Sequence, residues 1–246
     1  MSAPYQAQQS ALSFCPVLDE IVRTREVVGR SGKKLDTLAV STRNNLIVLR
    51  ALHLEKAATR TLEIGLRSGG SALVFAQTHK DLGNTLPEPH VALDPYQRRV
   101  WNDESGLVSL ERAGLRSFVD FREQFSCQGL PELLKDGARF QIIYIDGSHL
   151  FEDAFVDFYY SIRLLEKGGV ILFDDCRNRN INKVIRFIRS NFRALLAPLD
   201  LSRYREPGAL SSLKYRIADR LDLVQLRAFE KTGESERSHD APYSNF

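Results

Sequence analysis

Residues 61–76, TLEIGLRSGGSALVFA, constrain the fold of this chain more than any other stretch. A short apolar strand leads into a turn that contains Gly65, Gly69 and Gly70, and an amphipathic helix follows. Glycine lets backbone come close to a ligand, and the free N–H groups at the start of a helix attract its electronegative atoms. The spacing is not the G-x-G-x-x-G of dinucleotide-binding folds, and no Gly-Lys-Ser/Thr follows as in a P-loop. The stretch therefore predicts the opening of a nucleotide-binding α/β domain that belongs to neither of these types.

Strand and helix patterns alternate after residue 61, which predicts a parallel sheet with helices on both faces. The expected strands cover residues 61–64, 90–93, 117–121, 140–145 and 170–173. A helix is expected at 151–166, where Gly168 and Gly169 suit a left-handed cap. Residues 213–218 and 224–230 are expected to form a closing hairpin. The predicted fold class is therefore α/β, with a doubly wound, Rossmann-like sheet.

Two helical patterns precede the first strand, at 14–28 and from Ser41 or Thr42 to Lys56, and are expected to cover the sheet. A chain of 246 residues can hold one large α/β domain. The expected division is a disordered N-terminus at 1–12, a helical cover at 13–58, the main domain at 59–231 and a flexible tail at 232–246.

The composition is that of an ordinary globular chain, with 43% hydrophobic and 26% charged residues and a net charge of +3. Its cysteines, Cys15, Cys127 and Cys176, form no C-x-x-C pair and are expected to be reduced thiols. No apolar run has membrane-spanning length, and the first residues lack a secretory pattern. We therefore expect a cytoplasmic protein without a membrane span.

Acidic residues follow three of the expected strands, as Asp94, Asp146 and the pair Asp174-Asp175. In open α/β sheets, ligands bind beyond the carboxyl ends of the strands. Asp94 is therefore a candidate to accept hydrogen bonds from the ribose hydroxyls of an adenosine group. The alternative is that each aspartate caps the turn or helix that follows it. Glu63, in the first strand, could contact the same ligand or satisfy the backbone of the turn.

Asp146 and Asp174 end the fourth and fifth expected strands. If these strands pair, their axes lie about 4.8 Å apart, and the two carboxylates can share one divalent cation. Oxygen ligands suit magnesium or a similar hard ion. Such an ion could lower the pKa of a substrate hydroxyl, and His149 in the segment DGSH could accept the proton. A loop histidine bonded to backbone is the alternative for His149.

Taken together, the segments TLEIGLRSGGSA, ALDPY, FREQFSCQGLPELL and FQIIYIDGSHLFEDAFVDFYYSIRLLEKGGVILFDDC resemble class I S-adenosylmethionine-dependent methyltransferases. The resemblance covers roughly residues 60–190. Within the class, it is similar to the macrocin-type sugar O-methyltransferases and the cephalosporin-hydroxylase-like proteins. S-adenosylmethionine has no pyrophosphate, so its turn does not need the middle glycine of a dinucleotide site.

The resemblance implies a seven-stranded sheet of order 3-2-1-4-5-7-6 with an antiparallel last strand. It also implies roles for individual residues. The expected cofactor contacts are Glu63, Gly65, Arg67, Ser68, Gly69, Ser71, Asp94, Ser126 and Asp146. The expected cation ligands are Asp146, Asp174 and Asp175, and the expected catalytic residues are His149 and Asp146. Two positions depart from the family pattern, because Arg67 brings a bulky cation into the turn and Cys176 replaces an aromatic residue.

The resemblance leads us to expect an O-methyltransferase that acts on a small-molecule hydroxyl, with a sugar as the first guess for the acceptor. Six basic residues between Arg177 and Arg193 suggest a solvated helix face or a site for an acidic metabolite. No aromatic residues alternate with these cations, so nucleic acid is not the expected partner. The N-terminal helices could form a homodimer surface. A scaffold protein without chemistry and a dinucleotide oxidoreductase are the alternatives.

Overall fold

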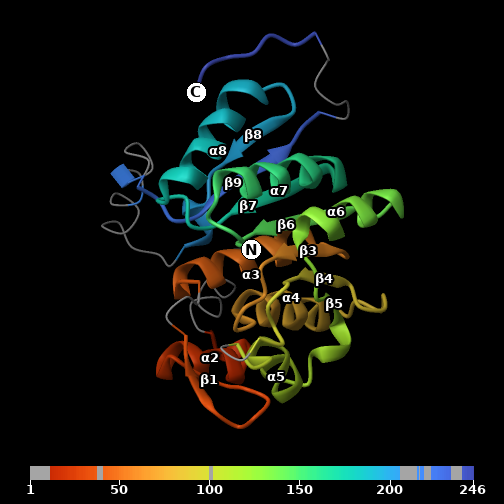
Figure 1. The fold of residues 1–246 in the computed structure, drawn as a ribbon, viewed down its shortest axis with the longest axis vertical. Helices are drawn as coiled ribbons and strands as arrows, with labels where there is room; N and C mark the ends of the chain where they lie inside the picture. Colours follow the sequence, from red (N-terminus) through yellow and green to blue (C-terminus); the bar gives the residue numbers. More distant parts are fainter. Residues whose placement is uncertain are drawn as a thin grey trace. The chain divides into compact units, whose positions relative to one another are not determined.

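The computed structural model describes residues 12–37, 41–99, 102–205, 215, 217–218, 223–233 and 240–246 (Figure 1). They fall into two compact units, one that extends to Phe125 and one that begins at Ser126, with Tyr204 and Arg205 in the first. The predicted disordered N-terminus lies outside the described residues except for Leu12, and so does part of the predicted tail, at 234–239. The predicted domain boundaries therefore stay predictions. Among the described helices, none is both long enough and apolar enough to span a membrane.

The first unit contains three parallel strands, β3 (Thr61–Ile64), β4 (His90–Leu93) and β5 (Val119–Arg122). Every residue of β3 and β4 is buried, as expected for parallel strands covered on both faces. Helix α4 (Gly70–Asp81) contacts both β3 and β4. The register aligns Ile64 with Leu93 and Leu93 with Arg122, so the segments that follow the three strands leave the sheet at one edge.

The N-terminal part of this unit contains two helices, as expected, and a hairpin that was not expected. Helix α2 (Pro16–Thr24) ends four residues earlier than predicted, because Arg25 takes a left-handed conformation. Strands β1 (Glu26–Val28) and β2 (Lys34–Asp36) then pair antiparallel. Helix α3 (Arg43–Lys56) confirms the second prediction, with the Thr42 side chain accepting a hydrogen bond from the N–H of Asn45. Helix α3 packs beside α4 (Figure 1), and a 3-10 turn, η1 (Leu12–Phe14), precedes α2.

The connection between β4 and β5 is less helical than the sequence suggests. The expected segment 98–113 is helical only over α5 (Ser105–Arg112) among its described residues. A 3-10 turn, η2 (Arg116–Phe118), takes the place of the first half of the expected third strand.

The second unit contains β6 (Phe140–Ile145), β7 (Leu165–Phe173), β8 (Leu196–Leu199) and β9 (Arg227–Lys231). Strands β6 and β7 are parallel, and β9 runs antiparallel to both β7 and β8. Helices α6 (Ser126–Lys135) and α8 (Arg179–Asn191) pack on either side of α7 (Phe151–Leu164). The strand order β5-β4-β3-β6-β7-β9-β8 confirms the predicted topology, including the antiparallel last strand.

Two local predictions in this unit are wrong. Helix α7 ends at Leu164, and Gly168 and Gly169 lie inside β7, where the register with β6 shifts, instead of capping the helix. Among the described residues, β9 pairs antiparallel with β7 and with Leu196–Leu199 of β8, where a hairpin with 213–218 was predicted. Part of 213–218 lies outside the described residues, and its described residues are helical. Strands that pair can be far apart in sequence. The short distance along the chain between 213–218 and 224–230 therefore did not identify the partner of β9.

Candidate functional site

The predicted glycine turn joins β3 to α4 in the first unit. Gly65 and Gly69 have φ angles of 96° and 79°, a region that favours glycine, and Arg67 between them has a φ of 40°. Ser68 and Ser71 are buried, whereas Arg67 is exposed. Because Gly69 is the N-cap of α4, the first N–H groups of the helix have no partner within the helix. The backbone of the turn is therefore suited to an electron-rich ligand.

Asp94, which directly follows β4, holds this turn through its side chain. Its Oδ2 accepts hydrogen bonds from the N–H groups of Leu66, at 3.1 Å, and Arg67, at 2.7 Å. Its Oδ1 accepts from the N–H of Tyr96, at 2.7 Å, and only 6% of the residue is exposed. The carboxylate therefore caps the glycine turn, which precedes it in the chain, and its bond to Tyr96 is the cap on the following turn that was considered from the sequence. Its contact with a ribose stays a prediction.

Two residues that the sequence did not single out complete the turn. Gln97 is fully buried, and its Nε2 donates to the carbonyl of Arg67 at 2.7 Å. The N–H of Gly106, in α5, donates to Gln97 Oε1 at 3.2 Å. A Cβ at Gly106 would lie 2.4 Å from the carbonyl oxygen of Arg67, and a Cβ at Gly69 would lie 2.9 Å from the carbonyl oxygen of Gly106. The glycine turn and α5 thus contact each other through their backbones. In the sequence, the only sign of this contact was Gly106, a glycine inside an otherwise helical segment.

Glu63 lies in a buried polar chain beneath the turn. Its Oε1 is 3.4 Å from Nε2 of His90, and neither residue is exposed. The Thr61 hydroxyl lies 2.8 Å from His90 Nδ1 and 2.9 Å from His79 Nε2. Burial lowers the pKa of His79 to about 2, so this histidine is neutral. Neither oxygen of Glu63 has a hydrogen-bond partner among the described residues. Its contact with a cofactor stays a prediction.

Three of the predicted side chains in the second unit converge. The carboxylates of Asp146 and Asp175 and a ring nitrogen of His149 offer ligand atoms that all lie within 4.8 Å of one another. His149 Nε2 is 2.7 Å from Asp175 Oδ2, and about half of its side chain is exposed. Asp146 follows β6 and Asp175 lies two residues after β7, and these strands are parallel neighbours. We call Asp146, His149 and Asp175 the carboxylate–histidine cluster.

Asp174, which was predicted to bind the same cation, does not belong to this cluster. Its Oδ2 accepts a hydrogen bond from the hydroxyl of the buried Tyr144, and its Oδ1 accepts from the N–H of Asp175 at 2.8 Å. Asp175 has a φ of 51°, and its own Oδ1 accepts from Gln225. Tyr144 could have been found in the sequence, since alternate residues of a strand share one face and Tyr144 is two positions before Asp146. Gln225 gave no such signal.

The remaining predicted contact, Ser126, begins α6 and lies near Asp157 of α7. Burial raises the pKa of Asp157 to about 7, and a hydrogen bond from Ser126 opposes this shift. The Ser126 side chain therefore has a partner inside the protein. Its predicted place against an adenine ring stays a prediction.

Part of this chain is similar to known methyltransferases. Residues 62–176 match a family model described as a methyltransferase domain. Caffeoyl-CoA O-methyltransferase 1 from Eucalyptus globulus is 31% identical over 121 residues, which are 48% of this chain and 45% of that protein. The caffeoyl-CoA O-methyltransferase from Petroselinum crispum is 31% identical over 122 residues, 48% and 46% of the two chains. The chain thus spans about half the length of these relatives.

Two solved structures share the fold at lower identity. An O-methyltransferase from Bacillus cereus in complex with SAH has a TM-score of 0.61 and 16% identity, with 88% of this chain and 90% of that chain covered. TomG from Streptomyces achromogenes, solved with SAM, has a TM-score of 0.61 and 20% identity, with 93% and 96% covered. Residues 62–176 are thus similar to a methyltransferase domain, and the fold is the one shared with these two structures.

Proposed function

We propose that this protein transfers a methyl group from S-adenosylmethionine to a hydroxyl of a small molecule, with the help of a divalent cation. The observation that carries the proposal is the carboxylate–histidine cluster, whose ligand atoms lie within 4.8 Å of one another at the ends of β6 and β7. It occurs in a chain whose residues 62–176 match a methyltransferase domain. The macrocin-type subgroup within the class remains a prediction.

The cofactor site would be built from the glycine turn and the ends of its strands. Gly65 and Gly69 allow close approach of the backbone, and the free N–H groups of α4 favour electron-rich atoms of the ligand. Glu63, Arg67, Ser68, Ser71, Asp94, Ser126 and Asp146 are the further proposed contacts. Bound there, S-adenosylmethionine supplies an electrophilic methyl group. The protein contributes chiefly alignment of the acceptor oxygen with that methyl group.

The carboxylate–histidine cluster fits a divalent cation by its chemistry. The two carboxylates are ligands that suit magnesium or manganese, and an imidazole beside them suits a transition-metal ion. A cation held there would supply Lewis-acid chemistry, because it would lower the pKa of a nearby acceptor hydroxyl. Asp146 and Asp175 would hold the ion. Asp174 would orient Asp175, because the N–H of Asp175 donates a hydrogen bond to Asp174 Oδ1. Asp174 as a direct ligand remains the alternative.

His149 has two candidate roles, as a ligand or as the base that takes the acceptor proton. Its position 2.7 Å from Asp175 supports a ligand, whereas its half-exposed ring supports a base. The variant His149→Ala separates them. If His149 is a ligand, the affinity for Mg²⁺ falls; if it is a base, the affinity is kept and turnover falls alone.

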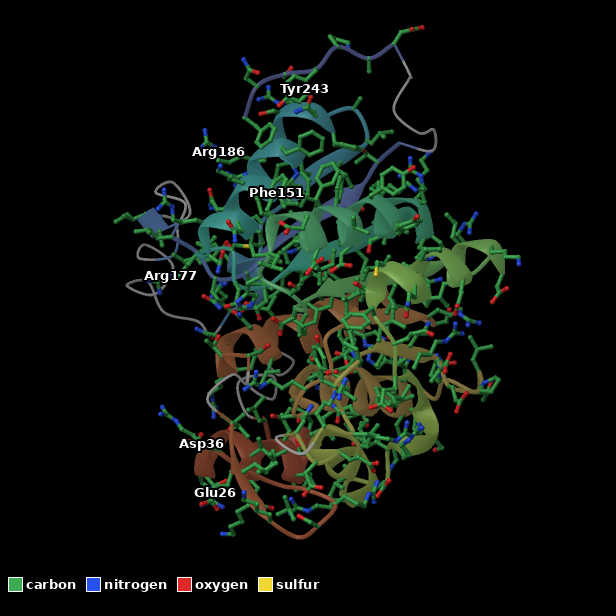
Figure 2. All side chains as sticks on the ribbon, viewed as in Figure 1. Glu26, Asp36, Phe151, Arg177, Arg186 and Tyr243 are labelled. Carbon is green, nitrogen blue, oxygen red and sulfur yellow. The ribbon has the colours of Figure 1, made fainter. Side chains whose placement is uncertain are left out.

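The acceptor would be a small molecule with a free hydroxyl, and a sugar or an acidic metabolite are the two proposed types. Arg177, Arg179, Lys183 and Arg186 are exposed, and none of them pairs with a carboxylate among the described residues. Arg177 and Arg186 point outward from the second unit (Figure 2). The Asn180 side chain donates to the carbonyl of His149 at 2.9 Å, so this basic segment begins beside the cluster. That position favours an acidic acceptor.

Titration calorimetry tests the proposal. S-adenosylmethionine and NAD would be titrated into the wild-type chain, each with and without Mg²⁺, and into Asp146→Ala. We expect binding of the methyl donor only, and loss of Mg²⁺ binding in the variant. Binding of NAD alone would indicate the oxidoreductase, and binding of the methyl donor without turnover of any hydroxyl acceptor would indicate the scaffold protein. Unchanged turnover in Asp146→Ala would remove the proposed role of this residue.

Two further features belong to the proposal. Cys15, Cys127 and Cys176 are free thiols, which fits a reducing cytoplasm. A homodimer through the N-terminal helices is the proposed assembly, and sedimentation of the full chain would show whether its mass is one or two copies.

A further inference from the structure

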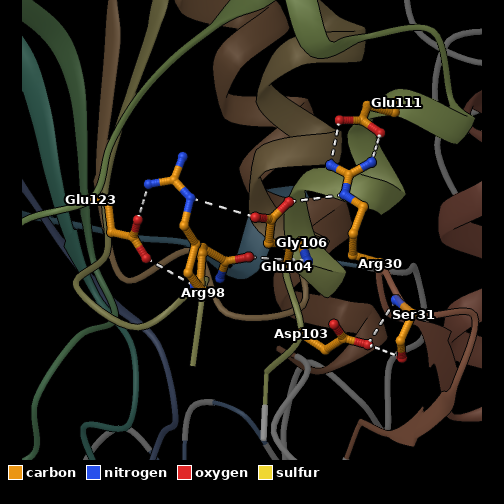
Figure 3. A network of polar contacts seen from close by, with 9 residues as sticks. Arg30, Ser31, Arg98, Asp103, Glu104, Gly106, Glu111 and Glu123 are labelled. Atoms are coloured by element: carbon orange, nitrogen blue, oxygen red, sulfur yellow. Dashed lines mark hydrogen bonds and ion pairs between the residues drawn. The ribbon is translucent and has the colours of Figure 1, made fainter. Parts of the chain in front are cut away.

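The tip of the β1–β2 hairpin forms hydrogen bonds with the segment that leads into α5 (Figure 3). The N–H of Arg30 donates to the carbonyl of Asp103 at 2.7 Å. The N–H and the hydroxyl of Ser31 both donate to Asp103 Oδ2, at 3.1 and 2.5 Å. A Cβ at Gly29 would lie 2.2 Å from the same oxygen, so a larger residue there would displace the Asp103 side chain. The hairpin is therefore fitted closely to Asp103.

Arg30 also holds two points of α5 at once. Its Nε donates to Glu104 Oε2 at 2.9 Å, and its two terminal nitrogens donate to Glu111 at 2.5 and 2.7 Å. Glu104 is the N-cap of α5, and Glu111 lies seven residues, or about two turns, further along the same face. The bidentate bond also keeps the pKa of Glu111 below its usual range. A single guanidinium thus fixes the helix at its start and near its end.

The backbone of the segment that the hairpin contacts, at Asp103 and Glu104, is strained. Asp103 and Glu104 have φ angles of 48° and 53°, in a region that residues other than glycine seldom occupy. Two successive residues keep such a conformation only when their surroundings determine it. The contacts from Arg30 and Ser31 fall on this pair. The N–H of Glu104 adds a bond to the carbonyl of Gln97 at 2.7 Å.

The position of α5 in turn determines that of the glycine turn. Gly106, two residues after Glu104, leaves no space for a Cβ against the carbonyl of Arg67. Gln97 bonds both Gly106 and that same carbonyl. A shift of the first turn of α5 would therefore move the backbone of residues 67–69 or open the contact. The hairpin contacts α5, and α5 contacts the glycine turn, so the three form a continuous series of contacts inside the first unit.

We infer that the β1–β2 hairpin, through Arg30, is a positioning element for the glycine turn and sets the affinity of that turn for the adenosyl ligand. The inference rests on the proposed function, since the ligand is the one proposed there. Arg30 acts through Glu104, Glu111 and Gly106 and is a positioning residue, not a catalytic one.

The test uses the full chain and S-adenosylhomocysteine, titrated by calorimetry into the wild type, Arg30→Ala and Lys34→Ala. Lys34 is the matched control, because it lies on the same hairpin and pairs with Glu26 at 2.8 Å. We expect Arg30→Ala to weaken binding by about two- to fivefold, the range for exposed ion pairs, and Lys34→Ala to leave it unchanged. With an active acceptor in hand, Arg30→Ala should raise KM for the methyl donor and leave kcat within about twofold.

A double variant shows whether the effect passes through α5. In a Glu104→Gln, Glu111→Gln background, Arg30→Ala should lower affinity less than it does in the wild type, because both ion pairs are already removed. Arg30→Lys should restore part of the affinity, and it also serves as the milder variant if Arg30→Ala does not fold. Equal affinity in wild type and Arg30→Ala would overturn the inference alone. If the wild type does not bind the ligand, the proposed function fails, and the inference fails with it.

Discussion

The hydroxyl of Tyr144 donates a hydrogen bond to Oδ2 of Asp174, and this contact gives the two adjacent aspartates after β7 different tasks. Asp174 is 4% exposed and turns toward the interior, whereas Asp175 pairs with His149. Sequence alone treats the two acids as equivalent members of one cation site. The structure makes Asp175 the candidate ligand and Asp174 its support.

The two aspartates should therefore respond differently to substitution. We expect Asp175→Asn to abolish measurable Mg²⁺ binding, since it removes a charged oxygen from the cluster. Asp174→Asn should weaken binding by roughly tenfold, as loss of a supporting residue commonly does. Calorimetry with Mg²⁺ measures both, with Asp136→Asn as a control at an exposed acidic position. Stronger loss in Asp174→Asn would make Asp174 the ligand.

Tyr144→Phe should lower the stability of the fold. It removes a donor from the buried Asp174 and leaves Oδ2 without that bond, which costs about 1–3 kcal/mol. Urea unfolding gives the change in the free energy of unfolding. Tyr159→Phe is the control, because Tyr159 is 45% exposed, and its stability should be unchanged. Equal midpoints for wild type and Tyr144→Phe would show that the hydroxyl has little energetic importance.

Gly106→Ala should weaken binding of S-adenosylhomocysteine more than Arg30→Ala does. Alanine in a helix is normally favoured over glycine by about 1 kcal/mol, so the helix itself should gain stability. The new Cβ would instead lie 2.4 Å from the carbonyl of Arg67, a backbone atom, and would push the glycine turn away. Calorimetry together with thermal unfolding checks this. If the variant is more stable and binds S-adenosylhomocysteine with normal affinity, the glycine turn can shift without a loss of affinity.

Asp157→Asn should change how stability depends on pH. Burial raises the pKa of Asp157 from 3.8 to about 7, so the folded protein keeps this proton after the unfolded chain has lost it. Stability from this group is therefore present below about pH 4 and is lost as the pH rises to about 7, by about 1.4 kcal/mol per pH unit. The isosteric variant cannot ionise. Relative to wild type, its stability should rise between pH 4 and 7 and then level off.

Urea unfolding of both proteins across this range gives the difference directly. Contributions from the buried histidines, whose pKa values are lowered, cancel in that difference. A difference that is constant with pH would mean that Asp157 titrates normally in the folded protein.

Much of the fold followed from local pattern. Strands β3, β4 and β6 have the predicted bounds, and the Thr42 cap starts α3 as expected. These predictions hold because apolar runs bounded by turn residues and capping side chains act over a few positions. The hairpin at β1 and β2 and the pairing of β9 with β8 were missed, because both depend on which chain segment is available as a partner.

The candidate site divides in the same way. Chain order predicted that Asp146 and Asp174 would come together if their strands paired, and β6 and β7 do pair in parallel. It could not reveal that Tyr144 takes Asp174 inward, or that Asp94 caps the glycine turn. Nor could it reveal that Gly106 touches Arg67. Those outcomes depend on side-chain directions and close backbone contacts between distant segments, which exist only after the chain has packed.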